Sequence, residues 1–104
     1  MVFRKQKYTQ FRERKIPRAP GVYKISINNK VRYVGLAIDL RKRYAQHLQS
    51  TEHNLELYNK MQGISKKEFE FLVVHEQGML AGVEKKEIKK YGAQLYNINH
   101  NKGE

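Results

Sequence analysis

Two tripeptides, Gly21-Val22-Tyr23 and Tyr33-Val34-Gly35, lie in two short segments in which apolar and other residues alternate. Apolar side chains at every second position over residues 22–27, and again over 31–35, indicate two β-strands. Asn28-Asn29-Lys30 between them is predicted to form a three-residue hairpin loop, with an Asn in the left-handed conformation. The first constraint on the fold is therefore an antiparallel hairpin.

A three-residue loop also predicts how the two strands pair. The expected opposed pairs are Ile27 with Val31, Ile25 with Tyr33, and Tyr23 with Gly35. This register places both tyrosines on one face of the hairpin, because side chains of a strand alternate between its two faces. Gly35 has no side chain, so we expect open space beside the phenol of Tyr23, large enough to admit a phosphate.

Three helices and one further strand are predicted after the hairpin. Asp39 is a candidate N-cap for a helix that runs to about residue 50, and a second helix is expected over 52–62, before a glycine. A third strand is predicted over 69–75 and a final helix over 80–91. From the hairpin onward, the chain is therefore expected to combine three strands with three helices.

The inward face of the final helix carries two carboxylates. Its apolar residues, spaced as in an amphipathic helix, are Leu80, Val83, Ile88 and Tyr91. Glu84 and Glu87 fall within the same arc. Periodicity does not separate them, because either one can pair with a lysine on the flank of the helix while the other serves a function.

The chain has 104 residues, the size of one domain with a modest core, and no cysteine. The lack of cysteine excludes disulfides and thiolate metal ligands, and it fits a reducing, cytoplasmic setting.

Lys and Arg outnumber Asp and Glu by 21 to 10, and the net charge of +11 favours nucleic acid as a partner. The alternatives are a basic surface kept for solubility and attraction to anionic lipid, although no targeting or membrane-spanning segment is visible.

Residues 1–20 contain seven Lys and Arg residues against one acidic residue, Glu13. We interpret this segment as a basic arm, part of which packs as a short helix before Pro17 and Pro20 impose an extended approach to the first strand. The arm residues expected to contact phosphates are Arg4, Lys5, Lys7, Arg12, Arg14 and Lys15, and the first helix adds Arg41 and Lys42. Such contacts supply affinity with little sequence specificity.

The two tripeptides, together with four polar residues that follow them in order, resemble the GIY-YIG nuclease superfamily. The residues that carry the resemblance are Tyr23, Tyr33, Arg43, His47, Glu84 and Asn97. The resemblance spans about residues 21–99 and implies the α+β fold of that superfamily, a three-stranded antiparallel sheet flanked by helices. It also implies that residues 21–104 form a catalytic domain, which the basic arm precedes.

The resemblance implies the hydrolysis of phosphodiester bonds, with a role for each matched residue. Glu84 would bind one divalent cation, Mg²⁺ or Mn²⁺, as a hard ion with oxygen ligands. Arg43 would bind the non-bridging phosphate oxygens and stabilise the transition state. Tyr23 would orient the attacking water or take its proton, and the second role requires a cation that lowers the pKa of the phenol.

Three further residues would complete the site that the resemblance implies. Tyr33 would support it by hydrogen bonding, His47 would contact phosphate or relay a proton, and Asn97 would brace it from the C-terminal segment. The segment Glu84-Lys85-Lys86-Glu87-Ile88-Lys89-Lys90-Tyr91, with Tyr96-Asn97 shortly after it, is similar to the metal-binding helix and closing asparagine of the excision-repair incision subunits, in which the first glutamate is the ligand. The gap to Asn97 is about one residue longer here, so Asn99 is the alternative.

The predicted function is that of a metal-dependent DNA endonuclease with single-stranded, duplex and branched DNA as candidate substrates. Candidate stacking surfaces for unpaired bases are Tyr8, Phe11, Tyr44 and Tyr58, which can equally pack in the core. One active site cuts one strand, so a double-strand break requires a homodimer or two successive cleavage events. A protein partner can supply specificity. The alternatives are a catalytically weak nucleic-acid-binding module of the same fold and, less supported by the motif, an RNA-associated basic protein.

Overall fold

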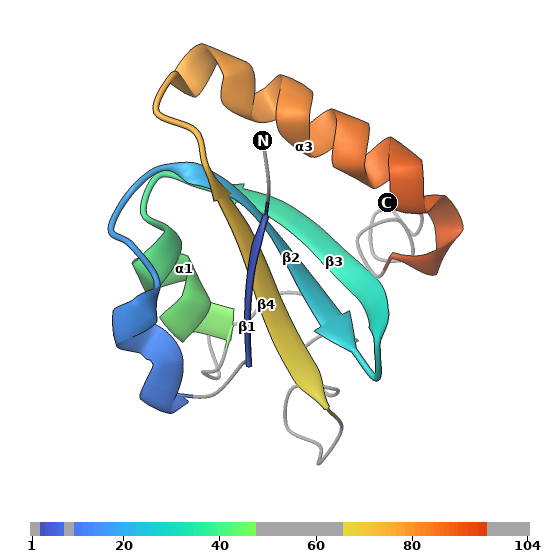
Figure 1. Cartoon of the computed structure of the whole chain (residues 1–104). Helices are drawn as coiled ribbons and strands as arrows, with labels where there is room; N and C mark the ends of the chain where they lie inside the picture. The colour runs from blue at the N-terminus through green and yellow to red at the C-terminus, as the bar shows by residue number, and fades with distance from the viewer. Residues whose placement is uncertain (1–2, 8–9, 48–65, 96–104) are drawn as a thin grey trace.

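The computed structural model describes residues 3–7, 10–47 and 66–95. In chain order its elements are β1 (Arg4–Lys7), the 3-10 helix η1 (Gln10–Lys15), β2 (Gly21–Ile27), β3 (Lys30–Ala37), α1 (Leu40–His47), β4 (Lys67–Val73), α3 (Gln77–Tyr91) and the 3-10 helix η2 (Gly92–Gln94) (Figure 1). The strand predicted over 69–75 is β4, displaced by two residues. The helix predicted over 52–62 lies outside the described residues.

The four strands form one antiparallel sheet in the order β1-β4-β2-β3 (Figure 1). The prediction of a three-stranded sheet was therefore wrong by one strand. The additional strand, β1, comes from the segment interpreted as a basic arm, and its Arg4 lies opposite Phe71 of β4. Three of the four residues of β1 are basic. The alternation that marks a strand in a sequence is therefore absent, and only pairing with β4 makes this segment a strand.

The β2–β3 hairpin closes through a turn of two residues, not three. Asn28 and Asn29 both have positive φ, 52° and 67°, which is the left-handed backbone of a type I′ turn. Ile27 consequently lies opposite Lys30, and the predicted pair of Ile27 with Val31 is wrong. Two adjacent asparagines favour this turn, because asparagine tolerates the left-handed conformation better than most residues.

A β-bulge corrects the offset of the shorter turn within a few residues. The register shifts between Ile25 and Ser26, where β3 contributes one extra residue, Arg32. Beyond the bulge, the two other predicted pairs are confirmed: Ile25 with Tyr33, and Tyr23 with Gly35. The two motif tyrosines therefore share one face of the sheet, as the sequence predicts.

Each face of the sheet carries a hydrophobic cluster of buried side chains. On the face of α1 and η1, the buried members are Ile16, Tyr23, Ile25, Ile27, Ala37, Leu40, Tyr44, Phe69 and Phe71. On the face of α3 and η2, they are Val22, Val34, Val74, Leu80 and Leu95. Every residue of β2 is buried, because helices cover both of its faces. β2 thus presents Tyr23 to the α1 side and Lys24 to the α3 side.

Asp39 caps α1, as predicted. Its Oδ1 accepts a hydrogen bond from the backbone N–H of Lys42 at 3.1 Å, and its Oδ2 accepts one from Nη1 of Arg18 at 2.9 Å. The hydrogen bond from Lys42 and the charge of Arg18 hold the pKa of Asp39 below its usual value. The described part of α1 ends at His47, so the predicted continuation to residue 50 lies outside the described residues.

α3 begins at Gln77, three residues earlier than predicted, and ends at Tyr91, as predicted. Gly92 follows with a φ of 57°, and its N–H bonds to the carbonyl of Ile88. The predicted inward face is confirmed by the side chains that pack against the sheet: Leu80, Val83, Ile88 and Tyr91. No helix of the described segments has the length and apolar character needed to cross a membrane.

Candidate active site

Tyr23 lies in the middle of β2, opposite Gly35 of β3. Its ring is fully buried and lies directly over Gly35, where an added Cβ would be 2.5 Å from Cζ and 2.8 Å from Cε1 of the tyrosine. The open space expected beside the phenol is therefore filled by the phenol itself, and that prediction was wrong. The glycine instead allows the ring to cross β3, the edge strand of the sheet.

Two aromatic neighbours hold the ring of Tyr23 in place. Phe69 stacks on it with a centroid distance of 5.3 Å and 10° between the ring planes, and Tyr33 stacks at 6.1 Å and 21°. These distances are typical of favourable aromatic pairs. Tyr33 is also hydrogen bonded to Tyr23. The position of the Tyr23 hydroxyl is therefore determined by side chains from both neighbouring strands.

Arg43 reaches the Tyr23 hydroxyl from α1. Its Nε donates a hydrogen bond to Oη of Tyr23 at 3.2 Å, and its Nη1 donates one to Oε1 of Gln46 at 3.1 Å. Arg43 also lines a cleft of about 560 Å³ between the end of β3 and α1. The guanidinium is thus oriented by the protein and borders a cleft, which suits the binding of a phosphate.

Burial raises the pKa of the Tyr23 hydroxyl, and the neighbouring Tyr33 raises it further. The charge of Arg43 and its hydrogen bond act in the opposite direction but do not outweigh burial. Burial lowers the pKa of the Arg43 guanidinium, yet its contacts with the two tyrosines give a net increase. At neutral pH the pair is a neutral phenol beside a charged guanidinium, which favours Tyr23 as a hydrogen-bonding group rather than as a base.

Glu84 approaches the same part of β3 from the other face of the sheet. It lies in α3, and the backbone N–H of Leu36 donates a hydrogen bond to its carboxylate. Leu36 follows Gly35, over which the phenol of Tyr23 lies. Burial raises the pKa of Glu84, and the hydrogen bond from Leu36 offsets only part of this effect. A half-buried carboxylate therefore lies one residue along β3 from the place where the tyrosine and the arginine meet.

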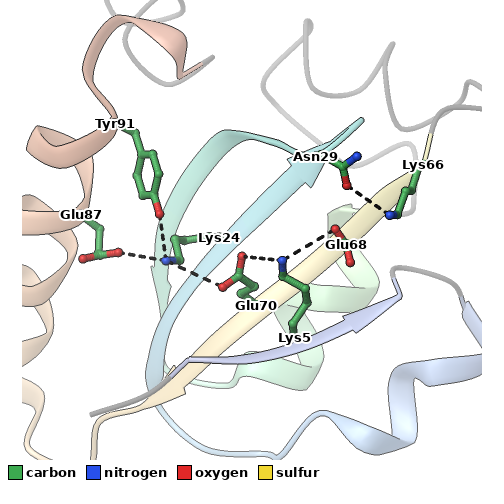
Figure 2. A network of polar contacts seen from close by, with 8 residues as sticks. All are labelled: Lys5, Lys24, Asn29, Lys66, Glu68, Glu70, Glu87 and Tyr91. Atoms are coloured by element: carbon green, nitrogen blue, oxygen red, sulfur yellow. Dashed lines mark hydrogen bonds and ion pairs between the residues drawn. The ribbon is translucent and has the colours of Figure 1, made fainter.

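The two carboxylates on the inward face of α3 have different partners. Glu87 accepts a hydrogen bond from Nζ of Lys24 at 3.1 Å (Figure 2). Lys24 is 5% exposed, and its Nζ also lies 3.8 Å from Glu70 and 3.2 Å from Oη of Tyr91 (Figure 2). Glu87 is held in this buried ion pair, whereas the described residues form no ion pair with Glu84. Of these two carboxylates, Glu84 is therefore the one that is not held in an ion pair by the described residues, and its role as a metal ligand stays a prediction.

The sequence patterns did not identify Lys24 as a buried residue that pairs with a glutamate of α3. It occupies the polar position between Tyr23 and Ile25, which an alternating strand presents to solvent. α3 covers that face, and the ring of Phe3 lies 4.0 Å from the Lys24 ammonium. The signal that could have found it is the pair of glutamates on an inward helix face, because a buried carboxylate requires a buried cation or hydrogen-bond donor.

For three of the predicted site residues, the structure does not describe the side chain. Asn97 and its alternative, Asn99, lie outside the described residues. His47 is placed by its backbone alone, as the last described residue of α1, four positions after Arg43 and hence on the same side of the helix. The roles of these residues stay predictions.

The predicted phosphate contacts gather in two places. Three of them line a cleft of about 620 Å³ beside β4, together with His75: Arg4, Arg14 and Lys15. Lys42 is exposed on α1 and lines the same cleft as Arg43. The backbones of Lys7 and Arg12 belong to β1 and η1. The N-terminal segment thus forms a second basic surface, separate from the cleft at Arg43.

Two other predicted phosphate contacts are engaged within the protein. Nζ of Lys5 lies 3.9 Å from Glu68 and 3.8 Å from Glu70 (Figure 2). Arg41 donates from Nε to the carbonyl oxygen of Ile16 at 2.7 Å, which ties α1 to the N-terminal segment. These contacts give both side chains a structural role, and their part in DNA binding stays a prediction.

One candidate stacking surface belongs to the core. Tyr44 is fully buried and packs edge-on against Phe69, with a centroid distance of 4.9 Å and 77° between the planes. It is therefore not accessible to a base. Phe11 is placed by its backbone in η1, and Tyr8 and Tyr58 lie outside the described residues.

A divalent cation at this site would have a single protein carboxylate. No group of three or more His, Cys, Asp or Glu side chains suited to a metal occurs in the parts of the chain that the structure describes. Mg²⁺ is compatible with such a site, because it retains several water ligands and is often held by one or two carboxylates. Burial of Glu84 disfavours its charged form, and a cation would offset that cost. The donor fits Mg²⁺ or Mn²⁺.

Solved structures share this fold. The GIY-YIG N-terminal endonuclease domain of UvrC from Thermotoga maritima, bound to its catalytic divalent cation magnesium, gives a TM-score of 0.60 at 24% identity, covering 80% of this chain and 93% of that chain. A point mutant of that domain, bound to the catalytic divalent cation, gives 0.59 at 23% identity, covering 80% of this chain and 92% of that chain. No curated protein sequence matches this chain at a significant level.

The sequence of this chain matches the GIY-YIG catalytic domain over residues 19–97. The match begins after η1 and includes all of β2, β3, α1, β4 and α3. It therefore contains the strand pair that brings Tyr23 over Gly35 and the two helices that carry Arg43 and Glu84. Because this match spans most of the chain and the solved domains share its fold, the chain belongs to the GIY-YIG nuclease family.

Proposed function

We propose that this protein is a metal-dependent endonuclease that hydrolyses phosphodiester bonds in DNA. The observation that supports the proposal is the approach of three side chains to residues 35–36 of β3: the Tyr23 hydroxyl, the Arg43 guanidinium and the Glu84 carboxylate. Ionisable groups with shifted pKa values beside a cleft are typical of functional sites. The net charge of +11 suits a polyanionic substrate.

Arg43 is the group that would bind the phosphate. Negative charge increases on the non-bridging oxygens during hydrolysis, and a fixed positive group stabilises that change. Arg43 lines the cleft and keeps its charge, and its hydrogen bond to Tyr23 holds the guanidinium in one orientation. A planar guanidinium can donate two parallel hydrogen bonds to one phosphate. We therefore assign Arg43 to transition-state stabilisation.

Tyr23 is assigned to the orientation of the attacking water. Because burial raises the pKa of its hydroxyl, the phenol stays protonated at neutral pH and acts through hydrogen bonds. Its stacked contacts with Phe69 and Tyr33 fix the direction of those hydrogen bonds. Tyr33 supports this arrangement through its own hydrogen bond to Tyr23. The proton of the water would leave through another group, for which His47 on α1 is the predicted candidate.

Glu84 is assigned to binding Mg²⁺ or Mn²⁺. When bound there, the cation would supply positive charge that polarises the phosphate and assists the departing oxygen. The hydrogen bond from the Leu36 N–H fixes the carboxylate against β3. Glu87 is kept apart by its ion pair with Lys24, so the metal-binding role falls to one glutamate of α3.

Replacing Glu84 with glutamine is expected to reduce metal-dependent cleavage by at least about 100-fold, with DNA binding retained. Glutamine keeps the size of the side chain and an oxygen that can accept the Leu36 hydrogen bond, but it lacks the charge that binds the cation. Cleavage is measured on matched labelled single-stranded, duplex and branched DNAs with Mg²⁺, with Mn²⁺ and with chelator.

The matched control for that experiment is Glu76→Gln. Glu76 is exposed directly before α3 and makes no capping hydrogen bond through its side chain, so this variant should cut as well as the unmodified protein. Undiminished cleavage by Glu84→Gln would reject the metal-ligand assignment. If the unmodified protein binds DNA tightly in a salt-sensitive way but never cuts it, the protein is a nucleic-acid-binding module of this fold.

Metal affinity is expected to weaken as the pH falls, because the Glu84 carboxylate must be deprotonated to bind the cation. Burial raises the pKa of Glu84, so protons compete with the cation at a higher pH than they would at an exposed carboxylate. The rise in melting temperature caused by Mn²⁺, measured from about pH 8 to about pH 5, should therefore shrink toward the acid end. A rise that is the same at every pH, or that persists in Glu84→Gln, would contradict this prediction.

A further inference from the structure

Two apolar side chains are exposed at the end of β3, next to the candidate active site. Leu36 is 36% exposed and Ile38 is 72% exposed. The backbone N–H of Leu36 is the group that bonds to the Glu84 carboxylate, so this residue adjoins the candidate active site. Single exposed apolar residues are common on protein surfaces, but this pair adjoins charged groups that have a proposed role.

Leu36 and Ile38 form the apolar side of the cleft that Arg43 lines. The opposite side is polar, and the full lining is Leu36, Ala37, Ile38, Asp39, Lys42, Arg43 and Gln46. The one carboxylate in this lining, Asp39, is already paired with Arg18 at 2.9 Å. Two cationic residues and two exposed aliphatic ones therefore line the same cleft of about 560 Å³.

The cationic side continues beyond this cleft across α1. A second cleft, of about 380 Å³, shares Lys42 and Gln46 with the first and is lined as well by Arg18, Arg41 and one acidic residue, Glu13. A chain of phosphates bound at Arg43 can therefore extend past Lys42 along the helix. Charge favours a polyanion on this path, while the aliphatic side of the first cleft favours an apolar surface attached to it.

We infer that the Leu36–Ile38 side of the cleft binds an unpaired base beside the phosphate that Arg43 holds. An unpaired nucleotide combines a phosphate with a flat apolar face, which matches the two sides of the cleft. In a duplex the same face is hidden between stacked neighbours, and aliphatic side chains reach it only by unstacking the bases. The inference rests on the proposed function and specifies its substrate class, which is DNA with unpaired nucleotides at the cut.

The test measures DNA binding in chelator, so that it does not depend on cleavage. Single-stranded oligonucleotides that carry one abasic site, at each position in turn, are bound by the unmodified protein and by Ile38→Ser. The variant should bind the intact strand about fivefold more weakly. At one position the abasic site should remove this difference, because the contact is already lost. Binding to the matched duplex should be unchanged.

Two further variants sharpen the result. Met79→Ser removes another exposed apolar side chain, 47% exposed on α3, and should leave binding unchanged. Ile38→Phe enlarges the apolar surface and should tighten binding to the intact strand by at least about twofold. Equal effects of Ile38→Ser on single-stranded and duplex DNA, or no abasic position that removes its effect, would overturn the inference.

The remaining outcomes separate this inference from the proposed nuclease. Position-specific coupling between Ile38 and one base, with no metal-dependent cleavage, would support the binding site and reject the nuclease. Cleavage of duplex DNA that is insensitive to Ile38→Ser would do the reverse. If Ile38→Ser instead changes the sedimentation of the free protein, the apolar side is a contact between two copies of the chain, and the inference is overturned.

Discussion

Replacing Gly35 with alanine is expected to reduce cleavage by at least about 100-fold. The new Cβ would be 2.5 Å from Cζ and 2.8 Å from Cε1 of Tyr23, and it would overlap the hydroxyl oxygen. The ring has no room to yield, because it is fully buried and stacked against Phe69. Movement of the phenol would break its hydrogen bond with Arg43 and displace both groups. Overpacking of this kind costs roughly 1–3 kcal/mol of stability.

Thermal unfolding and cleavage of Gly35→Ala are measured together with those of Gly82→Ala. An added Cβ at Gly82 meets no atom within 4 Å, and alanine is the better helix former, so this control should be slightly more stable and fully active. The expected pattern is a large loss of cleavage in Gly35→Ala with most of its stability retained. A fully active Gly35→Ala would show that the position of the Tyr23 phenol is not needed for cleavage.

Replacing Lys24 with methionine is expected to lower the free energy of unfolding by about 3–5 kcal/mol. The substitution keeps most of the side-chain volume but removes the charge that Glu87 and Glu70 share (Figure 2). Burial lowers the pKa of Lys24, but its contacts with Tyr91, Glu87 and Glu70 outweigh that effect and raise it overall. The stabilisation is therefore complete at neutral pH and is lost only as the pH rises above about 10.5.

Urea unfolding at neutral pH measures this prediction, with Lys5→Met as the matched control. Lys5 also lies near two carboxylates, but its side chain is 52% exposed, and such surface pairs contribute less than about 1 kcal/mol. The double variant Lys24→Met with Glu87→Leu should recover part of the loss, since it removes a carboxylate left without its partner. Equal effects of Lys24→Met and Lys5→Met would show that the buried network does not stabilise the fold.

The parts of the fold that were predicted correctly depend on contacts between near neighbours in the chain. Asp39 was identified as an N-cap because its partner, the N–H of Lys42, lies three residues away. The inward face of α3 followed from helical periodicity, and the opposition of Tyr23 to Gly35 from alternation in the hairpin. These patterns can be recognised from residues that lie close together in the sequence, without knowledge of the rest of the fold.

The wrong predictions concern features that depend on contacts between distant parts of the chain. β1 became a strand because β4 offers it an edge, and nothing within its own four residues indicates a strand. The turn at Asn28-Asn29 is one residue shorter than predicted, and the bulge at Ile25 conceals this difference at Tyr23. The space expected beside Tyr23 depended on where a buried ring lies, which is decided by stacking on Phe69 from a strand more than 40 residues later.

The same distinction between local patterns and tertiary contacts applies to the candidate site. The sequence by itself determined which residue types were available, the hairpin that faces Tyr23 with glycine, and the placement of Arg43 on a capped helix. Only the tertiary structure decided that Glu87 is held by Lys24, 63 residues away, and that Glu84 is left at β3. Helical periodicity indicates which face of a helix is turned inward, but it does not indicate which residues pack against that face. The identity of the opposing group depends on how distant segments pack, and here that packing separates an ion pair from a candidate metal ligand.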